Sequence, residues 1–279
     1  MDGINWAGRS WSNISIVPKA PDAQEFIQDH TIRVISYHVL ADSKCKDFTY
    51  TPFKYWDARS AILLSEIVTY DADVIMLQDA DHFMDFWQPK LMLLGYDSVF
   101  KQRTQTKDTY DEGCVVAYKR SKYQLFKTVN LEFNDSAHGE LNMKTTMKEK
   151  CRTDDVAVLA FLQPFADNRF PSAVCFACAQ FPEKDDYADV RAVHSKYFCT
   201  EIEKANAEFQ VPVVVGLSMN DCAFSATYHV MTCGRLPLTT VPPGRCPAPS
   251  GKPVSRGSVK LKWYHTSQQL LLKCYLLST

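Results

Sequence analysis

The sequence predicts an α/β fold in which a two-layered mixed β-sandwich is flanked by helices. Three observations support this fold class. Apolar residues make up 46% of the 279 residues, enough for a large core. Short apolar runs rich in β-branched residues alternate with helical patterns along part of the chain. Elsewhere two strand patterns follow each other directly, which favours mixed rather than wholly parallel sheets.

The first predicted elements are a strand, a helix and a second strand. "TIRVISYHVLA" (31–41) is rich in β-branched residues, which is typical of a buried strand. "DVIMLQ" (73–78) is a short apolar run of the same kind. Between them, 55–70 has the period of a helix. Its predicted buried face consists of Leu63, Leu64, Ile67 and Val68.

The next segment, 82–96, is predicted to be a helix that breaks or kinks at Pro89 and ends at Gly95. "GCVVAYK" (113–119) and "YQLFKTVNLEF" (123–133) are then predicted to be strands. The polar stretch that follows, 134–152, is predicted to be a loop with a helical turn.

The second half of the domain repeats this alternation. "DVAVLAFLQPF" (155–165) and "SAVCFACAQF" (172–181) are predicted strands. The longest predicted helix is 187–209, a buried strand follows at 211–216, and 224–234 is a helix that ends at Gly234. The residues expected to align on the inner face of the longest helix are Val190, Val193 and Tyr197.

Composition divides the chain into four parts. Residues 1–30 are an N-terminal extension, and 31–236 form the α/β domain. The segment 237–257 contains six Pro and is predicted to be a linker. The last part, 258–279, begins with an alternating run that ends in Trp263, similar to a strand of a fibronectin type III domain. We therefore expect a fragment of such a domain there.

Charge and cysteine content narrow the function classes. The net charge of −1 argues against a broad electrostatic surface for nucleic acid. The ten Cys have no framework spacing, the first residues lack the apolar core of a signal peptide, and no run reaches 18 apolar residues. These features predict reduced thiols, no membrane association, and a location in the cytoplasm or nucleus.

Several segments occur in an order and spacing that resemble one family. They include "IRVISYHVLAD", "YWDARSAILLSEIVTYDADVIMLQDADHF", "EGCVVAYKRSKYQL", "AVCFACAQF" and "VPVVVGLSMND". Together they are similar to the endonuclease/exonuclease/phosphatase superfamily, in its carbon-catabolite-repressor and nocturnin-type deadenylase branch. The resemblance implies Mg²⁺-dependent hydrolysis of phosphodiester bonds, and in deadenylases the removal of poly(A) from the 3′ end.

The resemblance also identifies the positions that carry the chemistry, and most are substituted here. His38 stands where the family has Asn, and Asp79 stands where it has the Glu that is the main metal ligand. Asp155 replaces an Asn near the substrate phosphate, and Gln180 replaces a His. Asp79 can still offer oxygen to a metal. His38 and Asp155 are thus candidate substrate-binding residues, Gln180 is a candidate catalytic residue, and Asp79 is a candidate metal ligand.

The most drastic substitutions follow the strand 211–216. The family sequence Gly-Asp-x-Asn is "GLSM" here, so that Leu217 and Met219 replace the Asp and the Asn. Neither side chain can bind Mg²⁺ or polarise water. Asn220 and Asp221 could replace them only if the loop shifted by two residues. The family's Ser-Asp-His motif is missing after Leu236, which predicts a C-terminally incomplete fold with an exposed sheet edge.

Three functional hypotheses remain open at this stage. The chain is a degenerate homologue, retained for binding RNA or a protein partner, with weak or no Mg²⁺ binding. Alternatively, it is a weakly active metal-dependent phosphodiesterase that uses His38, Asp79, Asn220 and Asp221. The third hypothesis is a truncated product without function. The sequence does not indicate an oligomeric state.

Three further motifs have simple structural interpretations. Cys175 and Cys178 are three apart in a strand and should face opposite sides, within the core rather than on zinc. His194 is expected at the surface or at a boundary of its helix. For His38 and Asp79 a hydrogen bond is favoured over a residual metal site.

Overall fold

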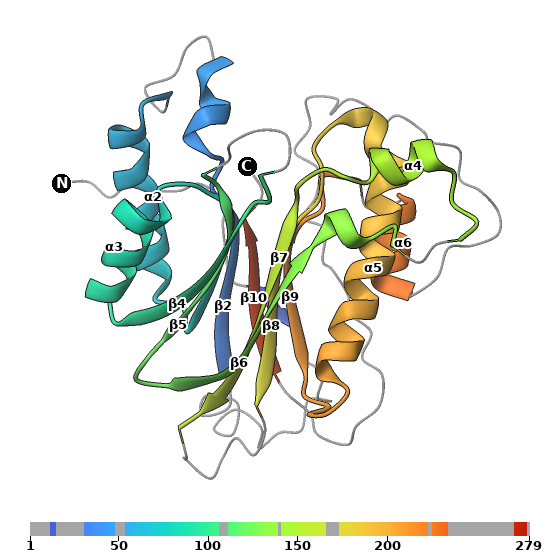
Figure 1. Ribbon diagram of the computed structural model, residues 1–279. Helices are drawn as coiled ribbons and strands as arrows, with labels where there is room; N and C mark the ends of the chain where they lie inside the picture. The colour runs from blue at the N-terminus through green and yellow to red at the C-terminus, as the bar shows by residue number, and fades with distance from the viewer. Residues whose placement is uncertain are drawn as a thin grey trace.

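The computed structural model describes residues 12–14, 31–47, 54–105, 111–138, 141–165, 173–222, 225–233 and 271–277. Two β-sheets pack face to face in the middle of the molecule, and helices cover the outer face of each sheet (Figure 1). The predicted α/β sandwich of mixed sheets is therefore confirmed.

The first sheet has six strands in the order β1-β10-β2-β3-β5-β4. Its central strands, β2 and β3, are parallel, and β3 pairs with β5 in the antiparallel direction. The continuous apolar runs predicted both central strands correctly, because a strand covered on both faces has no polar alternation. The strands span Ser12–Ile14 (β1), Leu271–Leu277 (β10), Thr31–His38 (β2), Val74–Ala80 (β3), Gly113–Lys119 (β5) and Tyr96–Gln102 (β4).

The second sheet has four strands in the order β6-β7-β8-β9. The pairs β6/β7 and β7/β8 are antiparallel, whereas β8 and β9 are parallel and are joined by a long helix. The strands span Tyr123–Glu132 (β6), Val156–Pro164 (β7), Val174–Gln180 (β8) and Val213–Ser218 (β9).

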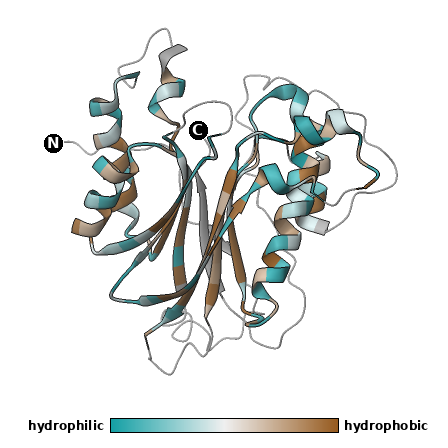
Figure 2. Ribbon diagram, viewed as in Figure 1, coloured by the Kyte–Doolittle hydropathy of each residue, from teal (hydrophilic) through white to brown (hydrophobic). Residues whose placement is uncertain are grey.

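Helices cover the outer faces of both sheets and separate the core into layers. The helices α2 and α3 lie against the first sheet, and α5 and α6 lie against the second (Figure 1). Hydrophobic residues line the strands and the inner faces of the helices (Figure 2). The helices span Trp56–Tyr70 (α2), Gln88–Leu93 (α3), Thr145–Lys150 (α4), Ala188–Asn206 (α5) and Ala226–Cys233 (α6).

The segment 82–96 is not one kinked helix. A π-helical turn, Phe83–Trp87, leads directly into α3, and Pro89 is the second residue of α3. Gly95 then adopts φ +88°, which confirms the predicted stop.

Two predicted helix faces are corrected. On α2, Leu63 and Ile67 are buried, but Val68 is exposed and the charged Glu66 is buried, because Glu66 accepts a hydrogen bond from Tyr37 Oη. On α5, His194 is fully buried rather than at the surface. Its ring stacks on Phe133, and Nε2 lies 3.1 Å from the carbonyl oxygen of Cys151. Burial lowers the pKa of His194 to about 4, although the Cys151 contact opposes this shift.

The C-terminal strand belongs to the first sheet. The strand β10 pairs in parallel with β2, and Leu271 lies opposite Thr31. The predicted fibronectin-like fragment, 258–279, stays a prediction. The predicted linker 237–257 and the alternating run 258–266 lie outside the described residues, so the other domain boundaries stay predictions.

Candidate functional site

The topology brings many strand ends to one edge of the sandwich. The parallel pairs β2/β3 and β8/β9 finish at this edge, as does β4, while the antiparallel strands β5 and β7 begin there. Residues just before β5 and β7 and just after the other strands therefore gather in one place. Ligand sites in layered α/β folds are typically found at such an edge.

Asp79 lies at the centre of this edge, near the end of β3. Its backbone is left-handed, with φ +59°, and the pairing of β3 with β5 shifts register between Leu77 and Ala80. A left-handed conformation is uncommon for residues other than Gly, and it occurs again nearby at Leu40 and Asn220. The side chain of Asp79 is fully buried.

Donors from this chain surround the Asp79 carboxylate. Lys44 Nζ donates to Oδ1 at 2.5 Å, and Gln180 Nε2 donates to the same oxygen at 3.3 Å. The backbone N–H of Ala41 donates to Oδ2 at 3.0 Å. His38 Nε2 lies 3.3 Å from Oδ2, but it lacks the geometry of a hydrogen bond. His38 and Asp79 are thus in contact without the well-formed hydrogen bond that was predicted.

Lys44 holds several carboxylates together. It lies in the 3₁₀ helix η1 (Asp42–Asp47), directly after β2. Besides Asp79, its Nζ lies 2.8 Å from Glu183 Oε1 and 3.9 Å from Glu112 Oε1. Gln180 Nε2 also donates to Glu183 Oε1, at 3.0 Å. One ammonium group thus has three carboxylates around it.

The pKa values of the central pair follow from these contacts. Burial alone would raise the pKa of the Asp79 carboxyl, but contacts with His38, Lys44 and the Ala41 N–H hold it well below its ordinary value. Burial alone would lower the pKa of Lys44, but the charges of Asp79 and Glu183 outweigh burial and raise it. Both groups are therefore charged at neutral pH.

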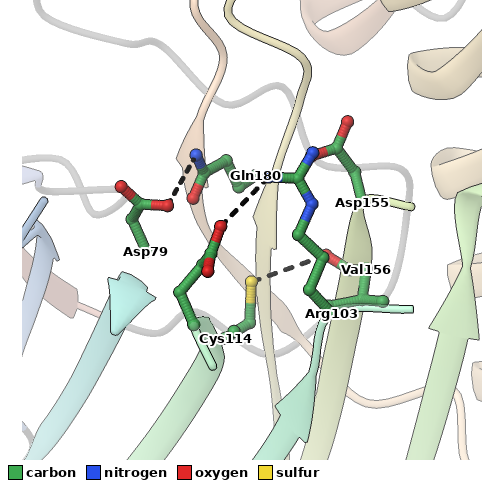
Figure 3. Close-up of a pocket in the computed structure, with 8 residues that line it drawn as sticks. Asp79, Arg103, Cys114, Asp155, Val156 and Gln180 are labelled. Atoms are coloured by element: carbon green, nitrogen blue, oxygen red, sulfur yellow. Dashed lines mark hydrogen bonds and ion pairs between the residues drawn. The ribbon is translucent and has the colours of Figure 1, made fainter. Parts of the chain in front are cut away.

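A second pair lies beside the first, in a narrow pocket (Figure 3). Arg103 contacts Glu112 Oε1 at 3.2 Å through Nη1 and Asp155 Oδ1 at 3.1 Å through Nη2. Burial raises the pKa of Asp155 to about 6, despite the opposing charge of Arg103. Asp79 and Gln180 also line the pocket. Across this edge of the sandwich, four carboxylates thus face the two cationic side chains Lys44 and Arg103, which makes the edge an unfavourable place for a phosphate.

The end of β9 differs from this charged centre. Leu217 and Met219 pack against the hydrophobic cluster between the second sheet and α5, which contains Phe181 and Phe198. Neither residue is among those that line the pocket. Ser218 pairs with Gln180 across β8 and β9. Leu217 and Met219 are therefore partly buried and pack against the core.

Asn220 and Asp221, the alternative catalytic residues, make structural contacts. Asn220 Nδ2 donates to the carbonyl oxygen of Phe181 at 2.7 Å. Asp221 Oδ2 accepts from Thr227 Oγ1 at 2.8 Å and from Arg191 Nε at 3.3 Å, and its Oδ1 accepts from the N–H of Cys222. These bonds tie the loop after β9 to α5 and α6. They leave Asp221 committed to the fold.

The residues at the edge do not fit the Mg²⁺ that the resemblance implies. His38, Asp79 and Glu183 offer donor atoms that lie within 4.8 Å of one another. Mg²⁺ favours octahedral oxygen ligands, and this set offers a ring nitrogen and two carboxylates. Both carboxylates already share the single positive charge of the Lys44 ammonium, which lies between them.

The prediction from sequence found only part of this site. Asp79, Gln180, His38 and Asp155 are brought together, whereas Leu217, Met219, Asn220 and Asp221 lie in structural roles beside it. Four charged residues were missed. Three of them, Lys44, Glu112 and Glu183, lie close to the end of a predicted strand. Arg103 follows β4, which was not predicted as a strand.

Both Cys of "CFAC" are buried, as predicted. Cys175 belongs to the layer beneath α5, and Cys178 belongs to the layer between the sheets, so the two thiols face opposite sides of β8. Within the described part of the chain, no helix is both long and apolar enough to cross a lipid bilayer.

Sequence relatives support the predicted branch. The chain is 26% identical to carbon catabolite repressor protein 4 homolog 2 of Arabidopsis thaliana over 225 residues, which is 73% of this chain and 37% of the relative. It is 29% identical to the CCR4-Not complex 3′-5′-exoribonuclease subunit Ccr4 of Mycosarcoma maydis, over 72% of this chain and 32% of the relative. The chain thus spans about a third of the length of these relatives.

Solved structures share the fold. The human Nocturnin catalytic domain with bound sulfate matches with a TM-score of 0.59 and 18% identity, over 79% of this chain and 71% of that one. ANGEL2, a 2′,3′-cyclic phosphatase, in complex with adenosine-2′,3′-vanadate, matches with a TM-score of 0.62 and 24% identity, over 74% and 58%. The model of the Endonuclease/Exonuclease/phosphatase family matches residues 47–259, past the predicted domain end at 236, so this chain belongs to that family.

Proposed function

We propose that this chain is a degenerate, catalytically inactive homologue of metal-dependent 3′-5′ exoribonucleases, retained as a binding module. One observation carries the proposal: the buried carboxylate of Asp79, at the family's main metal position, already accepts hydrogen bonds from Lys44, Gln180 and the Ala41 N–H. A carboxylate held in this way has little capacity left for a divalent cation.

The other substituted positions support the same proposal. Gln180 cannot exchange a proton in the way that His can, and Leu217 and Met219 offer no oxygen. Loss of one electrostatic or acid–base group typically lowers an enzyme's rate about 10²- to 10³-fold. Losses at one site are not additive, but this many substitutions leave little rate above background.

The charge of the pocket favours a protein over RNA as the partner. Four carboxylates face Lys44 and Arg103 at the edge where the family is expected to hold a phosphate. RNA affinity depends on neutralising backbone phosphates with cations, and these two cations are already paired. We therefore expect a protein partner, and the binding experiment below tests for RNA binding elsewhere on the molecule.

An assay with two substrates tests the proposal. The purified chain is incubated with labelled oligo(A) and with an oligonucleotide that ends in a 2′,3′-cyclic phosphate, in Mg²⁺ or Mn²⁺, beside an active angel-type relative. We expect neither shortening nor ring opening above the buffer rate, and the same result for Asp79→Asn. Activity in the natural chain that Asp79→Asn abolishes would instead support the weak-phosphodiesterase hypothesis.

Binding is measured separately on the same preparation. Fluorescence anisotropy with labelled oligo(A) at 50 mM and 200 mM salt would detect a phosphate-dependent complex, because such affinity falls steeply with salt. We expect no saturable binding below about 10 μM, where non-specific nucleic-acid binding is usually already seen at physiological salt. Tight, salt-sensitive binding would identify RNA as the partner and contradict the preference for protein.

A further inference from the structure

We infer that Lys44 serves as a built-in cation in the place of a divalent metal, and that removing it uncovers a transition-metal site made of His38, Asp79 and Glu183. The inference rests on the proposed function, because it assumes that the natural pocket is closed to divalent ions. It goes further in naming the residue that closes the pocket.

The contacts of Lys44 resemble a coordination sphere. Its Nζ lies 2.5 Å from Asp79 Oδ1, 2.8 Å from Glu183 Oε1 and 3.9 Å from Glu112 Oε1. These carboxylates come from three different strand ends, so that no local sequence pattern brings them together. Without a cation between them, three carboxylates at this spacing would repel one another. The ammonium therefore does what a bound metal ion would do for the shape of the edge.

The position of Lys44 distinguishes this contact from an ordinary surface ion pair. Exposed lysine–carboxylate pairs contribute little to the stability of a protein, since both side chains stay solvated. Here the Asp79 side chain is fully buried, and only 23% of the Lys44 side chain is exposed. The ammonium thus neutralises a carboxylate that has no access to solvent.

The donors that remain after removal of Lys44 define the kind of metal. His38 Nε2 is buried without a hydrogen-bond partner and lies 3.3 Å from Asp79 Oδ2. It lies within 4.8 Å of the carboxylate oxygens of Asp79 and Glu183. One imidazole and two carboxylates suit Zn²⁺ or Mn²⁺, whereas Mg²⁺ favours oxygen alone.

Gln180 would support such a site from outside the ligand set. Its Nε2 donates to Asp79 Oδ1 at 3.3 Å and to Glu183 Oε1 at 3.0 Å, so that it holds both carboxylates at a fixed separation. Hydrogen bonds of this kind to the ligands commonly orient a metal site. Gln180 does not depend on Lys44 for either bond, and the two carboxylates should stay aligned in its absence.

The test is calorimetric titration of the full chain with Zn²⁺, Mn²⁺ and Mg²⁺. We expect Lys44→Ala to bind Zn²⁺ at least about 100-fold more tightly than the natural chain, with a smaller gain for Mg²⁺. Lys44→Arg keeps the charge and should behave like the natural chain. The double variant Lys44→Ala/Asp79→Asn should lose the gain. Zn²⁺ binding by the cysteines is common to all variants, so only the difference between variants counts.

Melting temperatures give a readout independent of affinity. We expect Lys44→Ala to melt below the natural chain, Zn²⁺ to restore part of the loss, and EDTA to leave the natural chain unchanged. If Lys44→Ala does not fold, Lys44→Met keeps the aliphatic stem and replaces it in every arm. Equal Zn²⁺ affinity in the natural chain and a folded Lys44 variant would overturn the inference. The RNA assays of the proposed function use no Lys44 variant, so the failure of that proposal and the failure of this inference are seen in separate experiments.

Discussion

The end of β3 and the end of β9 lie at the same edge of the sandwich, yet their side chains have opposite surroundings. At β3 the position still carries a carboxylate, Asp79, and Lys44 supplies its counter-charge. At β9 the positions carry Leu217 and Met219, which pack into the layer beneath α5. The first end is polar and is paired with the Lys44 ammonium, whereas the side chains at the second end are partly buried against the hydrophobic core.

Because of this difference, replacing the present residues by the family residues should affect the two ends differently. At β3, one side chain separates the present arrangement from an open cluster of ligands. At β9, a reversal must place polar atoms where the fold now buries apolar surface, which is costly unless each polar atom finds a partner. How easily the family residues could be restored therefore depends more on the environment of each substituted residue than on the number of substitutions.

The largest expected effect comes from restoring the family residues at β9. We expect the double variant Leu217→Asp/Met219→Asn to lower the free energy of unfolding by about 4 kcal/mol, from lost apolar burial and desolvation of the new carboxylate. Urea denaturation followed by tryptophan fluorescence measures this change. The matched control, Leu217→Met/Met219→Leu, conserves volume and should cost less than about 1.5 kcal/mol. A loss below about 1 kcal/mol in the polar variant would mean that these positions face solvent.

The next largest effect is expected at Asp79. Asp79→Ala should destabilise the chain by about 3 kcal/mol, because it leaves the Lys44 ammonium and the Ala41 N–H without their main acceptor. Asp79→Asn keeps one oxygen for Ala41 and should cost less. Chemical denaturation of both variants, each also combined with Lys44→Met, gives a double-mutant cycle. A coupling energy near zero between Asp79 and Lys44 would show that the pair does not hold the edge together.

The buried frame was the predictable part of the fold. Continuous apolar runs predicted β2, β3 and β7 because strands covered on both faces have no alternation to misread. The misjudged positions involve polar partners that are distant in sequence. Glu66 is buried because Tyr37 donates to it, and His194 because it packs on Phe133. Periodicity ranks residues by hydrophobicity and cannot see such partners.

The candidate site was predictable only where a substitution could be compared with the family pattern. Asp79 and Gln180 were found in this way, and they do lie together. Lys44 was missed because nothing in "ADSKCKD" indicates that η1 folds back across the ends of β3 and β8. The side chains of Leu217 and Met219 could not be placed against the layer beneath α5 without the pairing of Ser218 with Gln180.

The smallest expected effect is that of Asp155, which lies in the charged pocket near the end of β3. Its side chain is nearly fully buried, and its pKa of about 6 lies above the ordinary value of 3.8. A raised pKa in the folded state means that the stability from this group is present below about pH 3.8 and is lost as the pH rises through 6. Asp155→Asn removes the charge with little change of shape, so we expect about 2 kcal/mol of added stability at pH 7. The difference from the natural chain should shrink towards zero at pH 4, measured by urea denaturation across this range.

Arg103→Gln, which removes the opposing cation, should lower the stability at pH 7. A destabilised Asp155→Asn at pH 7 would mean that the bond to Arg103 outweighs burial. Arg103 would then stabilise this edge of the sandwich in addition to Lys44.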